Sequence, residues 1–172
     1  AAPLYIHGLE GSAQGTKGSF MLAKFGHSGP NMLRAKRSNQ PGRPEGFEPS
    51  FEVMKTYLEK QPASVLVGSS FGGAITMALL QRKVWRGPVV LLAPAIEYYG
   101  FDLSLPPNTH AIVIHDPQDE LIDFSGSVHL LKANPKQCEL WASDGGHKLS
   151  TVTKNGLLER SVRLQMARAQ EG

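Results

Sequence analysis

The apolar residues of this chain recur in two distinct patterns. Short, mostly apolar runs predict strands that are buried on both faces, and they occupy residues 4–7, 64–67, 89–92, 111–114 and 137–141. Apolar residues three and four positions apart predict helices, at residues 16–25, 50–60, 74–80, 124–132 and 157–166. A weaker apolar stretch at residues 31–34 predicts one more strand.

Fully apolar strands separated by helices are typical of a parallel sheet that helices cover on both faces. The pattern therefore predicts an α/β fold: an open, mostly parallel sheet of about six strands with helices on both faces. The length of 172 residues favours a single domain over residues 1–172. In such sheets the functional groups gather at the carboxyl ends of the strands, so a site is expected there.

The composition narrows the possible functions. A hydrophobic fraction of 41% with 19% charged residues indicates a globular protein, and no apolar run is long enough to span a membrane. The net charge is only +3, and the densest basic residues lie in a loop rich in Pro and Gly without interleaved aromatic residues: Arg34, Lys36, Arg37 and Arg43. Neither a nucleic acid nor a membrane is therefore expected as a partner. The single cysteine, Cys138, cannot form an internal disulfide, which favours the cytoplasm.

A G-x-S-x-G motif covers residues 68–72 and lies between a predicted buried strand and a predicted helix. A serine on a sharp strand-to-helix turn exposes its hydroxyl group at the edge of the sheet, and the small residues around it let the turn close. Ser70 is therefore a candidate nucleophile. The alternative is a serine that only caps the helix or forms a turn.

A serine nucleophile needs a general base, and the base needs an acid that orients it. His147 follows the last predicted strand, and Asp119 follows the strand at residues 111–114, so both are expected at the same edge as Ser70. The order Ser, Asp, His along the chain is the one expected for an α/β-hydrolase. Asp116 and Asp123 are alternative acids, and His147 could instead be an ordinary surface histidine.

Two further elements complete the predicted site. The loop after the first strand could bring the N–H of Leu9 together with the N–H of Phe71, which follows the candidate nucleophile, to form an oxyanion hole. The candidates for lining a substrate pocket are Glu10, Tyr98, Tyr99 and Phe101. Alternatively, Glu10 is a solvated carboxylate and the aromatic residues pack a loop onto the domain.

These motifs, together with residues 4–8, 91–95, 118–123 and 145–147, resemble the α/β-hydrolases, and more narrowly the small bacterial esterases of minimal hydrolase fold. The resemblance implies a carboxylesterase-type serine hydrolase with a Ser70–Asp119–His147 triad, a small-molecule acyl substrate, and neither a metal nor an organic cofactor. Residues 94–109 are too few for a helical lid domain, which favours small, soluble substrates. A thioesterase or C–C bond hydrolase with the same triad, or a non-catalytic binding module on this fold, remains an alternative.

Overall fold

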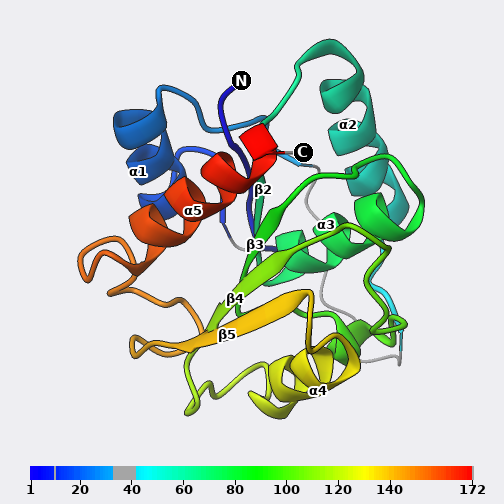
Figure 1. Ribbon diagram of the computed structural model, residues 1–172, viewed down its shortest axis with the longest axis vertical. Coiled ribbons are helices and arrows are strands. Elements are labelled where there is room, and N and C mark those ends of the chain that lie inside the picture. Colours follow the sequence, from blue (N-terminus) through cyan, green and yellow to red (C-terminus); the bar gives the residue numbers. More distant parts are fainter. Residues whose placement is uncertain (10, 33–41, 172) are drawn as a thin grey trace.

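The computed structural model describes residues 1–9, 11–32 and 42–171. Its described part contains one five-stranded, fully parallel sheet in which the strands lie side by side in chain order (Figure 1). The strands are β1 (Leu4–Ile6), β2 (Leu66–Ser69), β3 (Val89–Leu92), β4 (Ala111–His115) and β5 (Cys138–Ala142). The predicted α/β class with a parallel sheet is confirmed, whereas the expectation of about six strands is wrong by one in this part of the chain.

Helices cover both faces of the sheet, as the sequence predicted. They are α1 (Thr16–Phe25), α2 (Phe47–Lys60), α3 (Phe71–Gln81), α4 (Ser125–Ala133) and α5 (Leu157–Glu171). One core cluster joins α2, α3 and α4 to one face, and a second joins α1 and α5 to the other (Figure 1). Successive strand residues alternate between the clusters: Leu66 belongs to the first and Val67 to the second. Strands β1, β3 and β4 are buried at every position and are therefore almost wholly apolar, whereas the edge strand β5 is partly exposed and carries Glu139.

The strand register brings the carboxyl ends of the strands level with one another. Ser69 of β2 pairs with Leu92 of β3, and His115 of β4 pairs with Ala142 of β5. The residues that leave these strands therefore emerge along one edge of the sheet, although they are far apart in the chain. This edge carries the candidate site.

The sixth strand was expected at residues 31–34, of which 33 and 34 lie outside the described residues. The preceding segment does lie beside β1, because the N–H of Tyr5 donates to the carbonyl of Ser28 at 3.0 Å. A Cβ atom at Gly29 would lie only 2.6 Å from the Tyr5 carbonyl oxygen, and Pro30 has no N–H to give to a ladder. The segment therefore contacts the edge of β1 without forming a regular strand over residues 28–32.

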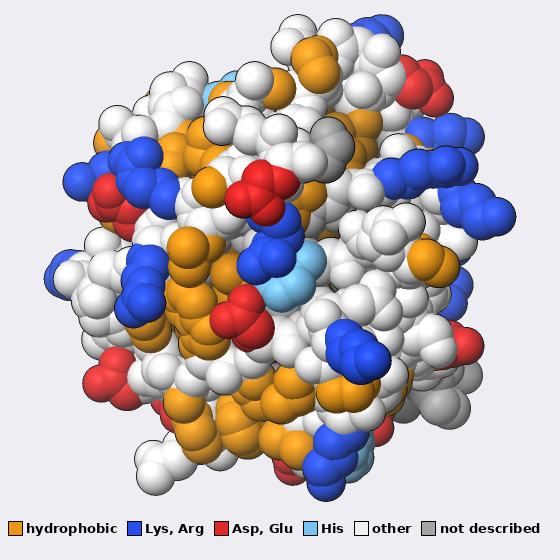
Figure 2. All heavy atoms as spheres, in the orientation of Figure 1, with side chains coloured by type: hydrophobic (Ala, Val, Ile, Leu, Met, Phe, Trp, Pro, Cys, Tyr) orange, Lys and Arg blue, Asp and Glu red, His pale blue; other side chains and the backbone are white. Residues whose placement is uncertain are grey.

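Opposite charges lie close together on the molecular surface. On the face drawn in Figure 2, Lys and Arg side chains neighbour Asp and Glu side chains around a band of hydrophobic ones. On α5, Glu159 accepts a hydrogen bond from Arg163 at 2.9 Å and lies 3.5 Å from the Lys24 amine of α1. In the described ranges, every helix is too short or too polar to cross a bilayer.

Candidate active site

Ser70 lies on the turn between β2 and α3 in a backbone conformation that non-glycine residues rarely adopt. Its φ is 55° and its ψ is −111°, which costs about 1–3 kcal/mol unless the surroundings enforce it. The surroundings do so through four backbone hydrogen bonds. The Ser70 N–H donates to Leu92 O at 2.8 Å, and the Ser70 carbonyl accepts the N–H groups of Gly73, Ala74 and Ala95 at 2.9, 3.3 and 3.0 Å.

Two glycines of the motif allow this turn to pack against its neighbours. A Cβ atom at Gly68 would lie 2.2 Å from the Thr76 hydroxyl oxygen, and one at Gly72 would lie 2.0 Å from the Ile6 carbonyl oxygen. Real Cβ atoms essentially never approach so closely. The G-x-S-x-G pattern thus reflects close contact of α3 with β2 and β1, and this contact fixes the direction in which Ser70 leaves the sheet.

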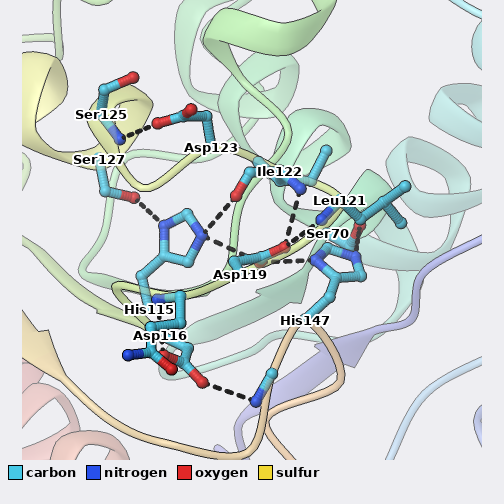
Figure 3. Close-up of polar contacts among 12 residues, drawn as sticks. Ser70, His115, Asp116, Asp119, Leu121, Ile122, Asp123, Ser125, Ser127 and His147 are labelled. Atoms are coloured by element: carbon cyan, nitrogen blue, oxygen red, sulfur yellow. Dashed lines mark hydrogen bonds and ion pairs between the residues drawn. The ribbon is translucent and has the colours of Figure 1, made fainter.

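The side chains of Ser70, His147 and Asp119 form a continuous hydrogen-bonded chain (Figure 3). The Ser70 Oγ lies 2.9 Å from His147 Nε2, and His147 Nδ1 lies 2.8 Å from Asp119 Oδ2. A carboxylate can only accept, so Nδ1 carries a proton in this contact and neutral His147 leaves Nε2 free to accept the Ser70 O–H. The geometry is the one required for a base that deprotonates a serine.

The Asp119 carboxylate is fully buried and has four donors. Oδ2 accepts hydrogen bonds from His147 Nδ1 and from His115 Nε2, which is described below, while Oδ1 accepts the N–H groups of Leu121 and Ile122, each at 2.8 Å. Burial raises the pKa of the Asp119 carboxyl, but the hydrogen bonds from His147 and the two backbone N–H groups outweigh it and hold the pKa below its ordinary value. Asp119 is therefore ionised near neutral pH and can stabilise a positive charge on His147.

The two alternative acids make other contacts. The Asp116 carboxylate accepts the N–H of Gln118 at 2.8 Å and the N–H of Gly146 at 2.7 Å, so it holds the loop that carries His147. The Asp123 carboxylate accepts the N–H of Ser125 at the start of α4, at 2.8 Å. Of the three carboxylates, Asp119 is the one that the structure brings to the His147 ring.

The loop after β1 lies next to Ser70. A Cβ atom at Gly8 would be 3.5 Å from the Ser70 Cβ, and the loop turns back through a hydrogen bond from Gly11 N–H to the Gly8 carbonyl at 3.2 Å. Phe71 is the first residue of α3, so its N–H has no acceptor within the helix. Leu9 follows Gly8 in this loop and Phe71 follows Ser70, so the two residues predicted to form an oxyanion hole both adjoin the contact between the loop and the Ser70 turn.

His7 braces this loop. Its Nδ1 lies 2.7 Å from the Gly8 carbonyl oxygen, and its Nε2 accepts the N–H of Met32 at 2.9 Å. These two contacts fit only the neutral ring with its proton on Nδ1. Burial lowers the pKa of His7, against the opposing effect of the Gly8 hydrogen bond, so this neutral form persists.

The residues predicted to line a substrate pocket have different surroundings in the structure. Phe101 is buried and its ring packs 5.6 Å from the ring of Phe47, so it belongs to the core. Tyr99 meets edge-on, at 6.2 Å, the ring of Phe71, the residue that follows the candidate nucleophile in the chain. Tyr98 is 60% exposed and packs edge-on against Tyr99. The remaining candidate, Glu10, lies outside the described residues.

The segment between β3 and β4 is short, as the sequence indicated. Residues 94–109 contain a single 3-10 turn, Glu97–Tyr99, and no lid helix. Across the ranges that the structure describes, no group of three His, Cys, Asp or Glu side chains is arranged to hold a metal ion.

Sequence reasoning missed a second histidine in contact with the acid. His115 ends β4, is fully buried, and places Nε2 3.0 Å from Asp119 Oδ2 (Figure 3). Its Nδ1 lies 2.7 Å from the Ser127 hydroxyl oxygen at the start of α4. The available signal was a titratable residue closing an otherwise apolar strand, four positions before the candidate acid.

Comparison with solved structures supports the same fold. The chain is similar to a candidate hydrolase of the alpha/beta superfamily from Xanthomonas campestris pv. campestris, with 20% identity, a TM-score of 0.70 and 99% of each chain covered. It is also similar to MGS-M1, an alpha/beta hydrolase enzyme from a Medee basin deep-sea metagenome library, with 20% identity, a TM-score of 0.66, and 99% of this chain and 85% of that chain covered.

A third similar structure is an alpha-beta serine hydrolase homologue from Coxiella burnetii, with 19% identity, a TM-score of 0.64, and 97% of this chain and 84% of that chain covered. No family model matches the sequence, and a search of curated proteins gives no significant match. The chain therefore has the fold of the small α/β-hydrolases, over nearly its whole length.

Proposed function

We propose that this protein is a serine hydrolase of the carboxylesterase type, which cleaves small acyl esters through an acyl-enzyme on Ser70. The observation that carries the proposal is the hydrogen-bonded chain from the strained Ser70 through His147 to the buried Asp119, at 2.9 and 2.8 Å. A serine that only capped a helix would need neither a histidine at its hydroxyl group nor a buried acid behind that histidine.

In the first half of the reaction, His147 Nε2 takes the Ser70 proton while Oγ forms a bond to the carbonyl carbon of the ester. The negative charge that develops on the carbonyl oxygen is stabilised by the N–H groups of Leu9 and Phe71, and one such donor typically contributes about 3 kcal/mol. The C–O bond then breaks, and the leaving alcohol takes its proton from His147. Asp119 stays ionised and holds the ring in the required orientation.

In the second half, water replaces the alcohol. It gives a proton to His147 Nε2 and forms a bond to the acyl carbon, and the bond between that carbon and Ser70 Oγ breaks as Oγ recovers its proton. The products are the free acid and the original enzyme. Apart from the ester and water, these steps use side chains and backbone N–H groups of this chain.

The short segment at residues 94–109 supports small acyl groups over large lipids, because it contributes no helical lid to the site. The same machinery can also cleave thioesters and some C–C bonds. Turnover of p-nitrophenyl acetate, an acyl-CoA and a β-diketone by the same preparation ranks these three classes. Faster turnover of either of the last two would reassign the substrate but not the nucleophile.

The nucleophile is tested by comparing Ser70→Ala with Ser69→Ala. Ser69 is a matched control because it adjoins Ser70 in the chain and its side chain hydrogen-bonds to Tyr5 of β1. We expect Ser70→Ala to abolish both ester turnover and covalent labelling by a fluorophosphonate, and Ser69→Ala to keep both. Labelling that persists in Ser70→Ala assigns the nucleophile to another residue. A wild-type protein that no serine-directed probe labels would instead indicate a non-catalytic binding module.

A further inference from the structure

We propose that His115 is a positioning residue of the active site, which holds the Asp119 carboxylate from behind and so keeps it in place beside His147. The proposal rests on the function proposed above. Asp119 Oδ2 lies between two imidazole rings, with His147 Nδ1 at 2.8 Å on one side and His115 Nε2 at 3.0 Å on the other (Figure 3). The chain of contacts thus continues past the acid to a second histidine and a second serine.

The contacts of His115 fix the position of its proton. Nε2 faces two acceptors, the Asp119 carboxylate and the Ile122 carbonyl oxygen at 3.1 Å, so Nε2 carries a hydrogen that both share. Nδ1 faces the Ser127 hydroxyl group at 2.7 Å, which can donate to it. Each polar atom of the ring therefore has a partner when the ring is neutral, and the proton at Nε2 points at Asp119.

A neutral ring at this position suits the chemistry. A protonated His115 would cancel the charge of Asp119 and weaken its attraction for a protonated His147, whereas a neutral N–H donor leaves that charge intact. Burial lowers the pKa of His115, and the Asp119 carboxylate opposes this only in part. The titratable side chains that face His115 within the described ranges are Asp119, His147 and Asp123.

The surroundings hold the ring in one orientation. The side chain of His115 is fully buried, and the Phe124 ring packs edge-on against it at 5.4 Å between centroids. Ser127, itself buried at the first turn of α4, holds the opposite nitrogen. A buried carboxylate whose donors are all fixed cannot rotate away from His147, and a misplacement of even about 1 Å at a catalytic group can cost roughly 100-fold in rate.

The test compares three substitutions in the full chain, with p-nitrophenyl acetate as the substrate. His115→Leu removes the donor, His115→Gln places an amide nitrogen near the former Nε2, and His115→Asn places it nearer to Nδ1, toward Ser127. We expect His115→Leu to lower kcat on the order of 10- to 100-fold with KM little changed. His115→Gln recovers most of that loss and His115→Asn does not.

The pH profile distinguishes positioning from simple packing. Without the His115 donor, Asp119 directs more of its charge to His147, so the inactive protonated form persists to higher pH. The acidic limb of kcat/KM therefore shifts upward in His115→Leu and not in His115→Gln. If His115→Leu does not fold, the Gln and Asn variants decide the question alone. Equal losses in Gln and Asn, or a folded Leu variant with wild-type kcat, overturn the proposal while leaving the wild-type esterase intact.

Discussion

Two histidine–carboxylate pairs lie at opposite ends of the same sheet, and they differ in almost every other respect. At the carboxyl ends, His147 Nδ1 contacts Asp119 at 2.8 Å, and the carboxylate is fully buried. At the amino ends, His110 Nε2 lies 3.3 Å from Glu139, whose side chain is 46% exposed. A histidine and a carboxylate are therefore paired at both ends, and their surroundings make the difference.

The remaining nitrogen of each ring has a different partner. His147 Nε2 meets the hydroxyl group of Ser70, a group that can become a nucleophile. His110 Nδ1 meets the Gln165 amide at 3.2 Å, which also donates to the His110 carbonyl and therefore holds the backbone. Glu139 is shared with Arg168, 3.9 Å away. A histidine–carboxylate pair becomes a candidate catalytic unit only where the carboxylate is buried and the other ring nitrogen of the histidine faces a reactive group.

The largest difference between the two ends is expected when each histidine is replaced in turn. His147→Ala is expected to lower kcat for p-nitrophenyl acetate by roughly 10⁶-fold, because the general base is lost. His110→Ala serves as the matched control and should leave kcat essentially unchanged. Steady-state kinetics on both folded variants measure the effect. A large loss in His110→Ala would show that the two ends are coupled.

Substitution of the two acids should give a somewhat smaller difference in kcat. Asp119→Asn keeps the size of the side chain but can hold His147 in the wrong tautomer, so kcat should fall by roughly 10⁴-fold. Glu139→Gln should leave kcat unchanged and alter the free energy of unfolding by less than about 1 kcal/mol, because exposed ion pairs contribute little. Kinetics and urea denaturation of both variants test this. Comparable kinetic losses would contradict the assignment of Asp119.

The smallest effect concerns the dependence of stability on pH. Burial lowers the pKa of His115 in the folded state, so the unfolded chain takes up a proton that the native protein does not as the pH falls through about 6.5. The contribution of this histidine to the free energy of unfolding is therefore present above that pH and is lost below it. The slope approaches about 1.4 kcal/mol per pH unit for each such histidine. Urea denaturation between pH 7.5 and 5.5 measures this slope.

Substitution of each histidine then compares the two ends of the sheet. His115→Gln should flatten the slope, whereas His110→Gln should flatten it less. Burial also lowers the pKa of His110, but its side chain is 16% exposed, whereas that of His115 is fully buried. A larger effect from His110→Gln would reverse the ranking of the two sites.

The hydrophobic pattern was enough to predict most of this fold. Strands that are apolar at every position can only be buried on both faces, and their order along the chain then puts Ser70, Asp119 and His147 at one edge. Spacing along the chain could not rank the nearby carboxylates as candidates for the acid that orients His147. Their ranking depends on how the turn after β4 folds, since this turn aims the N–H groups of Leu121 and Ile122 at Asp119 and leaves Asp116 to hold Gly146.

Two features depend on contacts that no local pattern encodes. His115 looks like the end of an apolar strand, and its role depends on a buried acid that folds back toward it and on Ser127 from the next helix. The count of strands depends on Gly29 and Pro30, which follow Ser28 beside the edge of β1. A weak apolar stretch further along was therefore not sufficient to predict how that edge is covered.

The contact at the edge of β1 also bears on how the protein behaves at high concentration. An exposed strand edge offers a row of unpaired N–H and C=O groups on which a second chain can add a strand, and this is a common route to aggregation. Here Ser28 already takes the N–H of Tyr5, Gly29 fits tightly against the Tyr5 carbonyl, and Pro30 has no N–H to donate. The irregular segment at residues 28–32 thus protects that edge from pairing with a neighbouring molecule, although it does not form a strand of the sheet itself.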